Sequence, residues 1–249
     1  MISYVRRKKI ADLLSKSEII YISDLKRAMP EISESTIKRE LRSMQQEGII
    51  EMLRGGAVKL YELHKVSYDT PMDLKEQQNI DRKERIAKFA ASLIHSGDAV
   101  FLDASSTVVP ILKYVGNKVI KIITSSIMLP LTFQNSTIDF YLVGGQYNPN
   151  TKSVLGTMTE QTLSNMFFDK AFLGANGFSE AGGVTTPDFR EQVKKQIIMK
   201  NSSITYFLMD SFKAGVNTLC KVADLGEVNI ITDEKNDLLD MFKSYKIAK

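Results

Sequence analysis

The chain has almost no cysteine or histidine. Cys220 is the single cysteine among 249 residues, and His64 and His95 are the two histidines. One cysteine excludes an internal disulfide, and neither histidine lies in a cluster of Cys, His and Asp residues at metal-ligand spacing. We therefore expect no metal site and no cofactor.

Long hydrophobic runs are also missing. No stretch reaches transmembrane length, and no N-terminal apolar segment resembles a signal peptide. We therefore predict a cytoplasmic protein. With 43% hydrophobic residues the chain is long enough to bury a sizeable core, and its length favours two domains.

The positive charge is distributed unevenly. Residues 1–60 carry 12 Lys and Arg against 8 Asp and Glu, whereas residues 61–249 carry 21 of each kind. The whole net charge of +4 therefore lies in the first quarter of the chain. A basic domain is typical of nucleic-acid binding, although many small domains are slightly basic for no such reason.

The stretch from Ser33 to Ala57 gives this charge a structural setting. Ser33 is a good N-cap, and Ile37, Leu41 and Met44 fall on one face of the helix that follows. Gly48 ends that helix, and residues 49–60 form two short strands that meet at Gly55 and Gly56, with Arg54 at the tip. A polar helix of this length fits the DNA major groove.

Shorter helical patterns precede this stretch. Residues 3–15 form one predicted helix, with four basic residues, Arg6, Arg7, Lys8 and Lys9, near its start. These residues either meet DNA phosphates or form a solvated face. A second predicted helix begins at Ser23 and ends before Pro30, so that two helices and a tight turn form a helix-turn-helix. The alternative, a generic helical hairpin, is weakened by the Gly-Gly hairpin that follows.

The remainder reads as a second domain. Residues 61–80 are polar, contain Pro71 and lack a period, so we predict a linker there, followed by a helix over 81–95 and a sensor domain over 81–249. Strands predicted at 99–102, 119–123, 138–143, 170–174, 204–209 and 228–232 alternate with helical or loop stretches at 107–115, 126–134, 157–166 and 188–201. This alternation predicts an α/β domain with a mostly parallel sheet, whose ligands bind at the carboxyl ends of the strands.

Small and polar residues follow several of these strands. The candidates are Asp103, Ser105, Ser106 and Thr107, then Thr124 and Ser125, then Gly144 and Gly145, and then Gly174 and Asn176. Hydroxyl groups and backbone amides at such positions bind anions such as phosphate, and glycine permits close approach of a ligand. Each motif alone is equally consistent with an ordinary cap or tight turn.

Charged residues complete the candidate site. Glu191, Lys194 and Lys195 lie within about one helical turn and are consistent with a surface charge pair as well as with a ligand site. Lys213, just past a predicted strand and near Gly215, is well placed to reach a phosphate. Glu191, Lys194 and Lys213 join the candidates for effector binding.

The combination resembles the DeoR family of bacterial transcription regulators. The recognition-helix signature matches at Ile32, Ser33, Thr36, Ile37, Lys38, Arg39, Glu40 and Leu41, and the wing matches at Arg54, Gly55, Gly56 and Ala57. The likeness extends from Arg7 to about Asp233, with Ser105 where the family has glycine. It implies a winged helix-turn-helix over residues 1–60 and a sensor domain similar to ribose-5-phosphate isomerase.

The resemblance also implies a function. The expected DNA-contacting residues are Ser35, Thr36, Lys38, Arg39, Arg42 and Arg54. The expected partners are double-stranded operator DNA and a phosphorylated sugar, which would control a repressor of carbohydrate genes acting as a homo-oligomer. The alternative is a sugar-phosphate isomerase or transferase with Glu191 as its base, but such an enzyme has no need of a basic DNA-reading domain.

Overall fold

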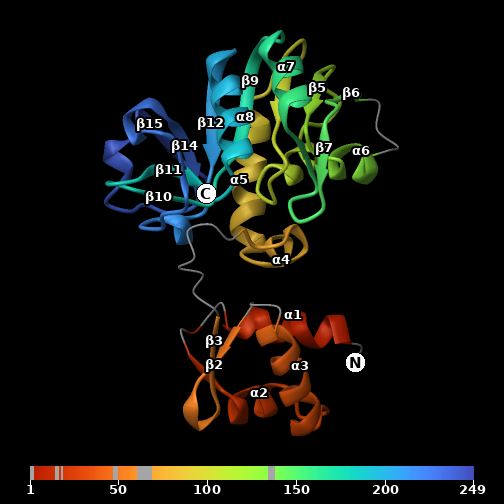
Figure 1. The fold of residues 1–249 in the computed structure, drawn as a ribbon, viewed down its shortest axis with the longest axis vertical. Coiled ribbons are helices and arrows are strands. Elements are labelled where there is room, and N and C mark those ends of the chain that lie inside the picture. The colour runs from red at the N-terminus through yellow and green to blue at the C-terminus, as the bar shows by residue number, and fades with distance from the viewer. Residues whose placement is uncertain (1–2, 15–16, 18, 47–49, 61–68, 134–137) are drawn as a thin grey trace. The chain divides into compact units, whose positions relative to one another are not determined.

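The computed structural model describes the whole chain except residues 1–2, 15–16, 18, 47–49, 61–68 and 134–137 (Figure 1). The predicted helix end at Gly48 and the first part of the predicted linker lie outside the described residues. Contacts divide the chain into two compact units, residues 1–64 with 77–79 and residues 65–76 with 80–249. Each unit is described by itself.

The smaller unit has elements consistent with the predicted winged helix-turn-helix. Its elements are α1 (Ser3–Leu14), β1 (Ile20–Tyr21), α2 (Ile22–Ala28), α3 (Glu34–Gln46), β2 (Ile50–Met52) and β3 (Ala57–Leu60). The strands form an antiparallel sheet in the order β1-β3-β2. Gly55 and Gly56 turn the wing with φ of 81° and 77°, values that side chains rarely allow, so glycine is required there.

The start of α3 follows the sequence prediction closely. Ser33 Oγ accepts a hydrogen bond from Thr36 N at 3.2 Å, which caps the helix. Ile37, Leu41 and Met44 are at most 1% exposed and pack in the core of the unit. The period of the apolar residues therefore fixes which face of α3 remains outside.

The basic run on α1 has an internal role that the sequence did not indicate. Arg6 and Arg7 both pair with the buried carboxylate of Glu40 on α3, Arg7 through Nε at 3.1 Å. Arg7 also donates to Ser43 Oγ at 2.6 Å. These two arginines tie α1 to α3, so the expectation that they form a solvated face is wrong.

The larger unit is built on a seven-stranded parallel sheet. The strand order is β15-β14-β12-β9-β4-β5-β6. The bounds are β4 Ala99–Leu102, β5 Lys121–Thr124, β6 Asp139–Leu142, β9 Phe168–Gly174, β12 Ser202–Leu208, β14 Asn229–Thr232 and β15 Ser244–Ile247. Both faces carry helices (Figure 1). The helices are α4 Met72–Gln77, α5 Ile80–Ser92, α6 Met128–Thr132, α7 Thr157–Ser164 and α8 Phe189–Lys200.

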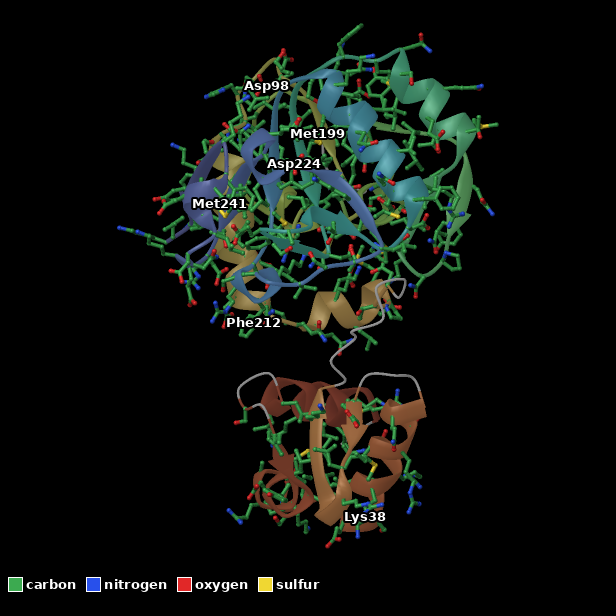
Figure 2. The ribbon with its side chains drawn as sticks, turned by 60° about the vertical axis from the view of Figure 1, so that its left-hand side comes forward. Lys38, Asp98, Met199, Phe212, Asp224 and Met241 are labelled. Atoms are coloured by element: carbon green, nitrogen blue, oxygen red, sulfur yellow. The ribbon has the colours of Figure 1, made fainter. Side chains whose placement is uncertain are left out.

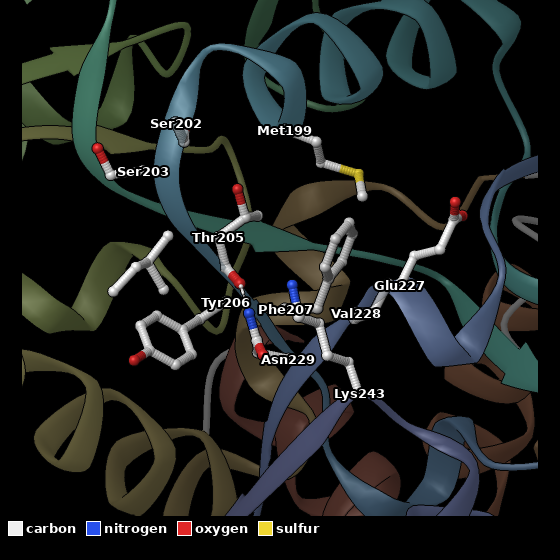
Figure 3. Close-up of a pocket in the computed structure, with 11 residues that line it drawn as sticks. Met199, Ser202, Ser203, Thr205, Tyr206, Phe207, Glu227, Val228, Asn229 and Lys243 are labelled. Atoms are coloured by element: carbon white, nitrogen blue, oxygen red, sulfur yellow. Dashed lines mark hydrogen bonds between the residues drawn. The ribbon is translucent and has the colours of Figure 1, made fainter.

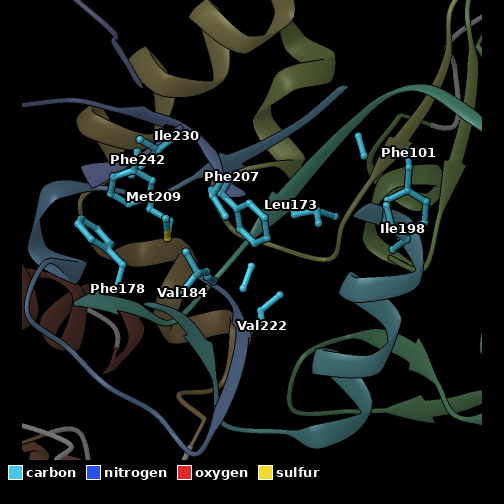
Figure 4. Close-up of a cluster of buried hydrophobic side chains, with 14 of the residues drawn as sticks. Phe101, Leu173, Phe178, Val184, Ile198, Phe207, Met209, Val222, Ile230 and Phe242 are labelled. Carbon is cyan, nitrogen blue, oxygen red and sulfur yellow. The ribbon is translucent and has the colours of Figure 1, made fainter. Parts of the chain in front are cut away.

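Alternating residues of the strands supply two separate hydrophobic cores. On β4, Phe101 packs in a cluster with Leu163 of α7 and Ile198 of α8 (Figure 4). Its neighbours Val100 and Leu102 pack on the other face with α5. This period of two on nearly continuous apolar strands is the pattern of a sheet that is covered on both faces.

Several predicted elements differ from the structure. The predicted linker contains α4. The stretch at 107–115, predicted as helical or loop, contains a short 3₁₀ helix, Val109–Lys113. Two β-branched residues and Pro110 disfavour a regular α-helix there. Short strands that the sequence analysis did not predict form a hairpin and a three-stranded sheet. They are β7 Gln146–Asn148, β8 Ser153–Leu155, β10 Gly177–Ser179, β11 Gly183–Thr186 and β13 Cys220–Ala223.

Candidate functional site

A cluster of four charged side chains lies at the carboxyl ends of the central strands. Asp103 directly follows β4, and Glu191, Lys194 and Lys195 lie on α8. All four are buried, with exposures of 1%, 6%, 0% and 4%. Asp103 accepts from Lys195 Nζ at 2.5 Å and lies 3.1 Å from Lys194 Nζ. Glu191 Oε2 lies 2.9 Å from Lys194 Nζ and 3.0 Å from Lys195 Nζ.

The two lysines keep both carboxylates ionised. Burial acts to raise the pKa of Asp103, but Lys194 and Lys195 outweigh it and hold that pKa below its usual range. The pKa of Glu191 is lowered by the same two lysines against the same effect of burial. In turn, Asp103 and Glu191 overcome the burial of Lys195 and raise its pKa. Two positive and two negative charges therefore compensate one another in the interior.

Hydroxyl groups fix the geometry of this cluster. Ser125, after β5, accepts from Lys194 Nζ at 3.0 Å, and Ser153 Oγ on β8 donates to Glu191 Oε1 at 3.0 Å. Thr124 Oγ1 donates to the Leu102 carbonyl at 2.6 Å and accepts from Ser126 N at 2.9 Å, which shapes the turn after β5. The cluster is thus held from three strand ends and one helix.

A small cavity of about 30 Å³ adjoins the cluster. Its lining comes from strand ends, from α8 and from the segment that precedes α5. The lining residues are Asp69, Met72, Lys75, Ala104, Ser105, Thr151, Gly174, Asn176, Thr186, Glu191 and Lys195. Carboxylates, ammonium groups, an amide and hydroxyls together can bind the hydroxyls and the anionic group of a small polar ligand.

The structure brings together most of the residues chosen from the sequence. Ser105, Gly174, Asn176 and Glu191 line the cavity, and the adjoining contacts include Asp103, Lys194 and Ser125. Ser106 and Thr107 are buried, and Thr124 shapes a turn. None of these last three lines the cavity.

Lys213 and the glycine pair after β6 hold different positions. Lys213 Nζ donates to the Ala175 carbonyl at 2.6 Å, next to Asn176. Gly144 and Gly145 are exposed and are not among the lining residues; the Gly144 carbonyl accepts from Thr159 Oγ1 on α7 at 2.8 Å. The structure therefore does not join this glycine pair to the cavity.

Several contributors to the site were not among the residues chosen from the sequence. Lys195, for which a surface charge pair and a ligand site were both open, is buried and contacts both carboxylates of the cluster. Ala104, Thr151 and Thr186 line the cavity, and Ser153 contacts Glu191. Asp69, Met72 and Lys75 lie in the segment predicted as a linker. The Glu-Lys spacing on α8 could have indicated Lys195. Nothing in the sequence of the predicted linker indicated Asp69, Met72 or Lys75.

Gly174 is needed because Ser105 occupies the space that a side chain would take. A Cβ at position 174 would lie 2.3 Å from Ser105 Oγ and 2.5 Å from Ser105 Cβ. We expect Gly174→Ala to lower the free energy of unfolding by about 1–3 kcal/mol through overpacking. Chemical denaturation measures this, and adding Ser105→Gly should restore most of the loss. A double variant no more stable than Gly174→Ala alone would contradict this account.

A buried lysine beside the site titrates near neutral pH. Lys83 on α5 donates to the Lys75 carbonyl, and burial together with Lys213 lowers its pKa to about 7. Its pKa in the unfolded chain is about 10.4, so between pH 7 and 10 the unfolded state binds more protons and stability rises with pH.

Lys83→Met should remove this rise. We expect the stability of the natural protein, relative to the variant, to increase by about 1 kcal/mol per pH unit between pH 7 and 9. Denaturation midpoints and slopes measured over this range test the expectation. Parallel pH profiles for the two proteins would show that Lys83 does not titrate there.

A larger groove of about 360 Å³ lies at the opposite ends of the strands (Figure 3). Its lining includes the first residues of β12, among them Ser202, Ser203 and Thr205, and Asn229 at the start of β14. The Asn229 side chain donates to the Thr205 carbonyl at 2.9 Å. This groove is at the amino-terminal edge of the sheet, away from the residues predicted to bind a ligand.

The candidate DNA interface lies on the smaller unit. Of the predicted contact residues, Ser35, Arg39, Arg42 and Arg54 are exposed, and Thr36 and Lys38 are partly buried. Lys38 lies on the outer side of α3 and pairs with Glu34 at 2.6 Å (Figure 2). Arg54 is at the wing tip, so helix and wing both present cations.

Metal clusters and membrane-spanning helices are both absent from the described part of the chain. No group of three or more His, Cys, Asp or Glu side chains there could hold a metal ion. Within the same residues, every helix is too short or too polar to cross a membrane.

Comparison with known proteins extends over nearly the whole chain. The sequence model of the DeoR C-terminal sensor domain matches residues 78–234. The entire chain is 31% identical to the uncharacterized HTH-type transcriptional regulator FruR of Bacillus subtilis (strain 168), of which it covers 98%. Over 96% of its length it is 28% identical to the lactose phosphotransferase system repressor of Staphylococcus epidermidis, of which it covers 94%.

The chain is also similar to solved structures at low sequence identity. The chain matches ribose 5-phosphate isomerase A from Methanocaldococcus jannaschii over 55% of both chains, with 20% identity and a TM-score of 0.40.

Proposed function

We propose, from the premise that this chain belongs to the DeoR family of transcriptional regulators, that its cavity binds a phosphorylated sugar and thereby controls binding to operator DNA. The observation that carries the proposal is the set of opposite charges around the cavity. Lys75 and Lys195 suit an anionic phosphate, whereas Glu191, Asn176 and Thr186 suit sugar hydroxyls. The Staphylococcus epidermidis relative is named for a lactose phosphotransferase system, which accords with a carbohydrate effector.

The isomerase alternative is set aside. The relatives that match 96% or more of this chain are named as transcriptional regulators or repressors. The chemistry agrees, because a general base works best with a pKa near the working pH. Two buried lysines instead lower the pKa of Glu191, which makes it a weaker base.

On the DNA side, α3 enters the major groove and the wing contacts the backbone. The exposed Arg39 and Arg42 lie on the outer face of α3 and are placed to reach base edges, while Arg54 is placed to meet a phosphate. Two copies would read the two halves of a pseudo-palindromic operator, so a dimer or larger homo-oligomer is part of this proposal. The bound oligomer would repress by blocking transcription, and the effector would then release the oligomer from the operator.

A typical coupling free energy makes this scheme workable. An effector that changes DNA affinity through a coupling of about 1–3 kcal/mol alters that affinity by about 5- to 150-fold. The coupling is reciprocal, so operator DNA changes the affinity for the effector by the same factor.

A panel of sugar phosphates tests the proposal. A compound present at about 100 times its dissociation constant stabilises the folded protein by about 2.7 kcal/mol, which raises the melting temperature. The same compound should change the affinity for the operator in a fluorescence anisotropy titration. The unphosphorylated sugars are the matched controls. If no sugar phosphate alters either quantity more than its unphosphorylated control does, the proposal is wrong.

A further inference from the structure

The cavity is too small for the ligand that the preceding proposal assigns to it. Its volume of about 30 Å³ leaves room for only a few water molecules. Pockets for small organic ligands have volumes of about 300–1,000 Å³. A sugar phosphate therefore enters only if some of the lining groups move away.

The part of the lining that lies outside the sheets, their connecting loops and α8 is the segment Asp69–Lys75. Asp69 precedes the six-residue helix α4, and Lys75 lies on it. The buried side chain of Met72 and several polar contacts hold this segment. Met72 N donates to the Asn150 carbonyl and Asn150 Nδ2 to the Asp69 carbonyl, both at 2.8 Å, while Lys83 donates to the Lys75 carbonyl and Lys152 pairs with Asp73.

The side chain of Asp69 already occupies an anion site. Its carboxylate accepts a hydrogen bond from Asn176 Nδ2 at 2.7 Å and pairs with Lys75 Nζ. The side chains of Asp69 and Lys75 are only 15% and 25% exposed. Lys195 lines the same cavity, so the carboxylate shares it with two ammonium groups and an amide donor.

Lys213 lies beside this site. Its Nζ donates to the Ala175 carbonyl at 2.6 Å, next to Asn176, and burial lowers its pKa. The charges of Lys195 and Lys213 are already met in part by Asp103, Glu191 and Asp210. A phosphate, with three strong acceptor oxygens, can accept from Lys75, Lys195 and Asn176 at once, whereas the Asp69 carboxylate accepts from Lys75 and Asn176.

We propose that Asp69 is an internal counter-ion which occupies the phosphate subsite and which the phosphate of the effector displaces. This inference rests on the proposed function and adds its route of regulation. When phosphate takes over Lys75 and Asn176, Asp69 loses both side-chain partners, and the Asp69 end of the segment separates from the sheet edge while Lys75 stays on the phosphate. Eight residues, 61–68, separate this segment from the end of β3 in the DNA-binding unit. A change at the site therefore occurs near the DNA-binding unit along the chain.

The test compares Asp69→Asn with Asp73→Asn in the full-length protein. Both substitutions remove one negative charge from the same segment, but Asp73 is 67% exposed and pairs with Lys152 outside the cavity. Titration calorimetry with inorganic phosphate measures the affinity. We expect Asp69→Asn to bind phosphate about tenfold or more tightly than the natural protein, because the competing carboxylate is gone. Asp73→Asn should bind like the natural protein.

Amide hydrogen exchange provides a second readout that needs no variant. Phosphate should increase exchange of the amides of Asp69, Thr70 and Met72 in the natural protein, because this end of the segment separates from its partners. In Asp69→Asn that exchange should be high before phosphate is added. If phosphate slows exchange in this segment, the displacement scheme is wrong.

The possible failures are distinct. If the natural protein and Asp69→Asn bind phosphate equally, or Asp69→Asn binds it more weakly, Asp69 is not a competing counter-ion, although the sensor function stands. If neither protein binds inorganic phosphate or any sugar phosphate, the proposed function fails together with this inference. Binding by Asp69→Asn alone supports the inference.

Discussion

Replacing Arg39 with alanine is expected to weaken operator binding by about 10- to 100-fold. Arg39 is exposed on α3, whose opposite face is buried through Ile37 and Leu41. Loss of one arginine that contacts a base edge costs about 1–3 kcal/mol, which corresponds to this range. Anisotropy titrations with operator DNA at a fixed salt concentration measure the effect, since phosphate contacts make all such affinities depend on salt.

A matched substitution separates this effect from a general loss of charge. Arg85 on α5 is also exposed but belongs to the larger unit, so Arg85→Ala removes the same charge without touching the recognition helix. We expect it to leave operator binding within about twofold, since a distant exposed charge is largely screened. Arg39→Ala should keep its thermal response to sugar phosphates. If Arg39→Ala lost DNA binding and effector binding equally, the assignment of these two functions to separate units would be wrong.

Replacing Asp103 with alanine is expected to be the most destabilising single change in the larger unit. It leaves Lys194 and Lys195 buried with Glu191 as their remaining carboxylate partner. Breaking a buried ion pair by removing one partner costs about 3–5 kcal/mol, because the other charge stays desolvated. Chemical denaturation followed by circular dichroism measures the loss. Asp237→Ala, at an exposed position, is the control and should change stability by about 0.5 kcal/mol or less.

The stability lost in Asp103→Ala should depend on pH and should be smaller in acid. The pKa values of Asp103 and Glu191 are lowered in the folded state, whereas the unfolded values are about 3.9 and 4.3. Their contribution to stability is therefore complete above about pH 5 and disappears as the pH falls through the folded pKa values. The stability difference between the natural protein and Asp103→Ala should be constant from pH 5 to 8 and should shrink below pH 4. A constant difference down to pH 2 would exclude this electrostatic origin.

Local patterns made the smaller unit and the sheet predictable. The cap at Ser33, the helical spacing of Ile37 and Leu41 and the glycine pair of the wing each depend on neighbours a few residues away. The apolar runs of the strands predicted a buried parallel sheet for a similar reason. The strands β10 and β13, with the sequences GFS and CKVA, lack the apolar run that marks the strands of the large sheet.

Residues joined over long separations in the sequence were not predictable. Glu40 pairs with Arg6 across 34 residues, and Asp69 meets Asn176 across 107. On α8, a Glu followed by Lys at helical spacing is usually a surface pair, and only the fold shows that Lys195 faces Asp103 in the interior. Sequence spacing identified the chemistry of these side chains but not their burial.

The position of α4 also determines where the chain can be divided for separate study. A sensor fragment that starts at Asp81, after the polar stretch, lacks Asp69, Met72 and Lys75, and with them one wall of the cavity. It also removes the backbone contacts with Asn150 and the carbonyl that Lys83 binds. Such a fragment would lose the buried side chain of Met72 and would report ligand affinities for an opened site. A fragment that begins before Asp69 keeps the site closed and is the appropriate one for crystallography and ligand screening.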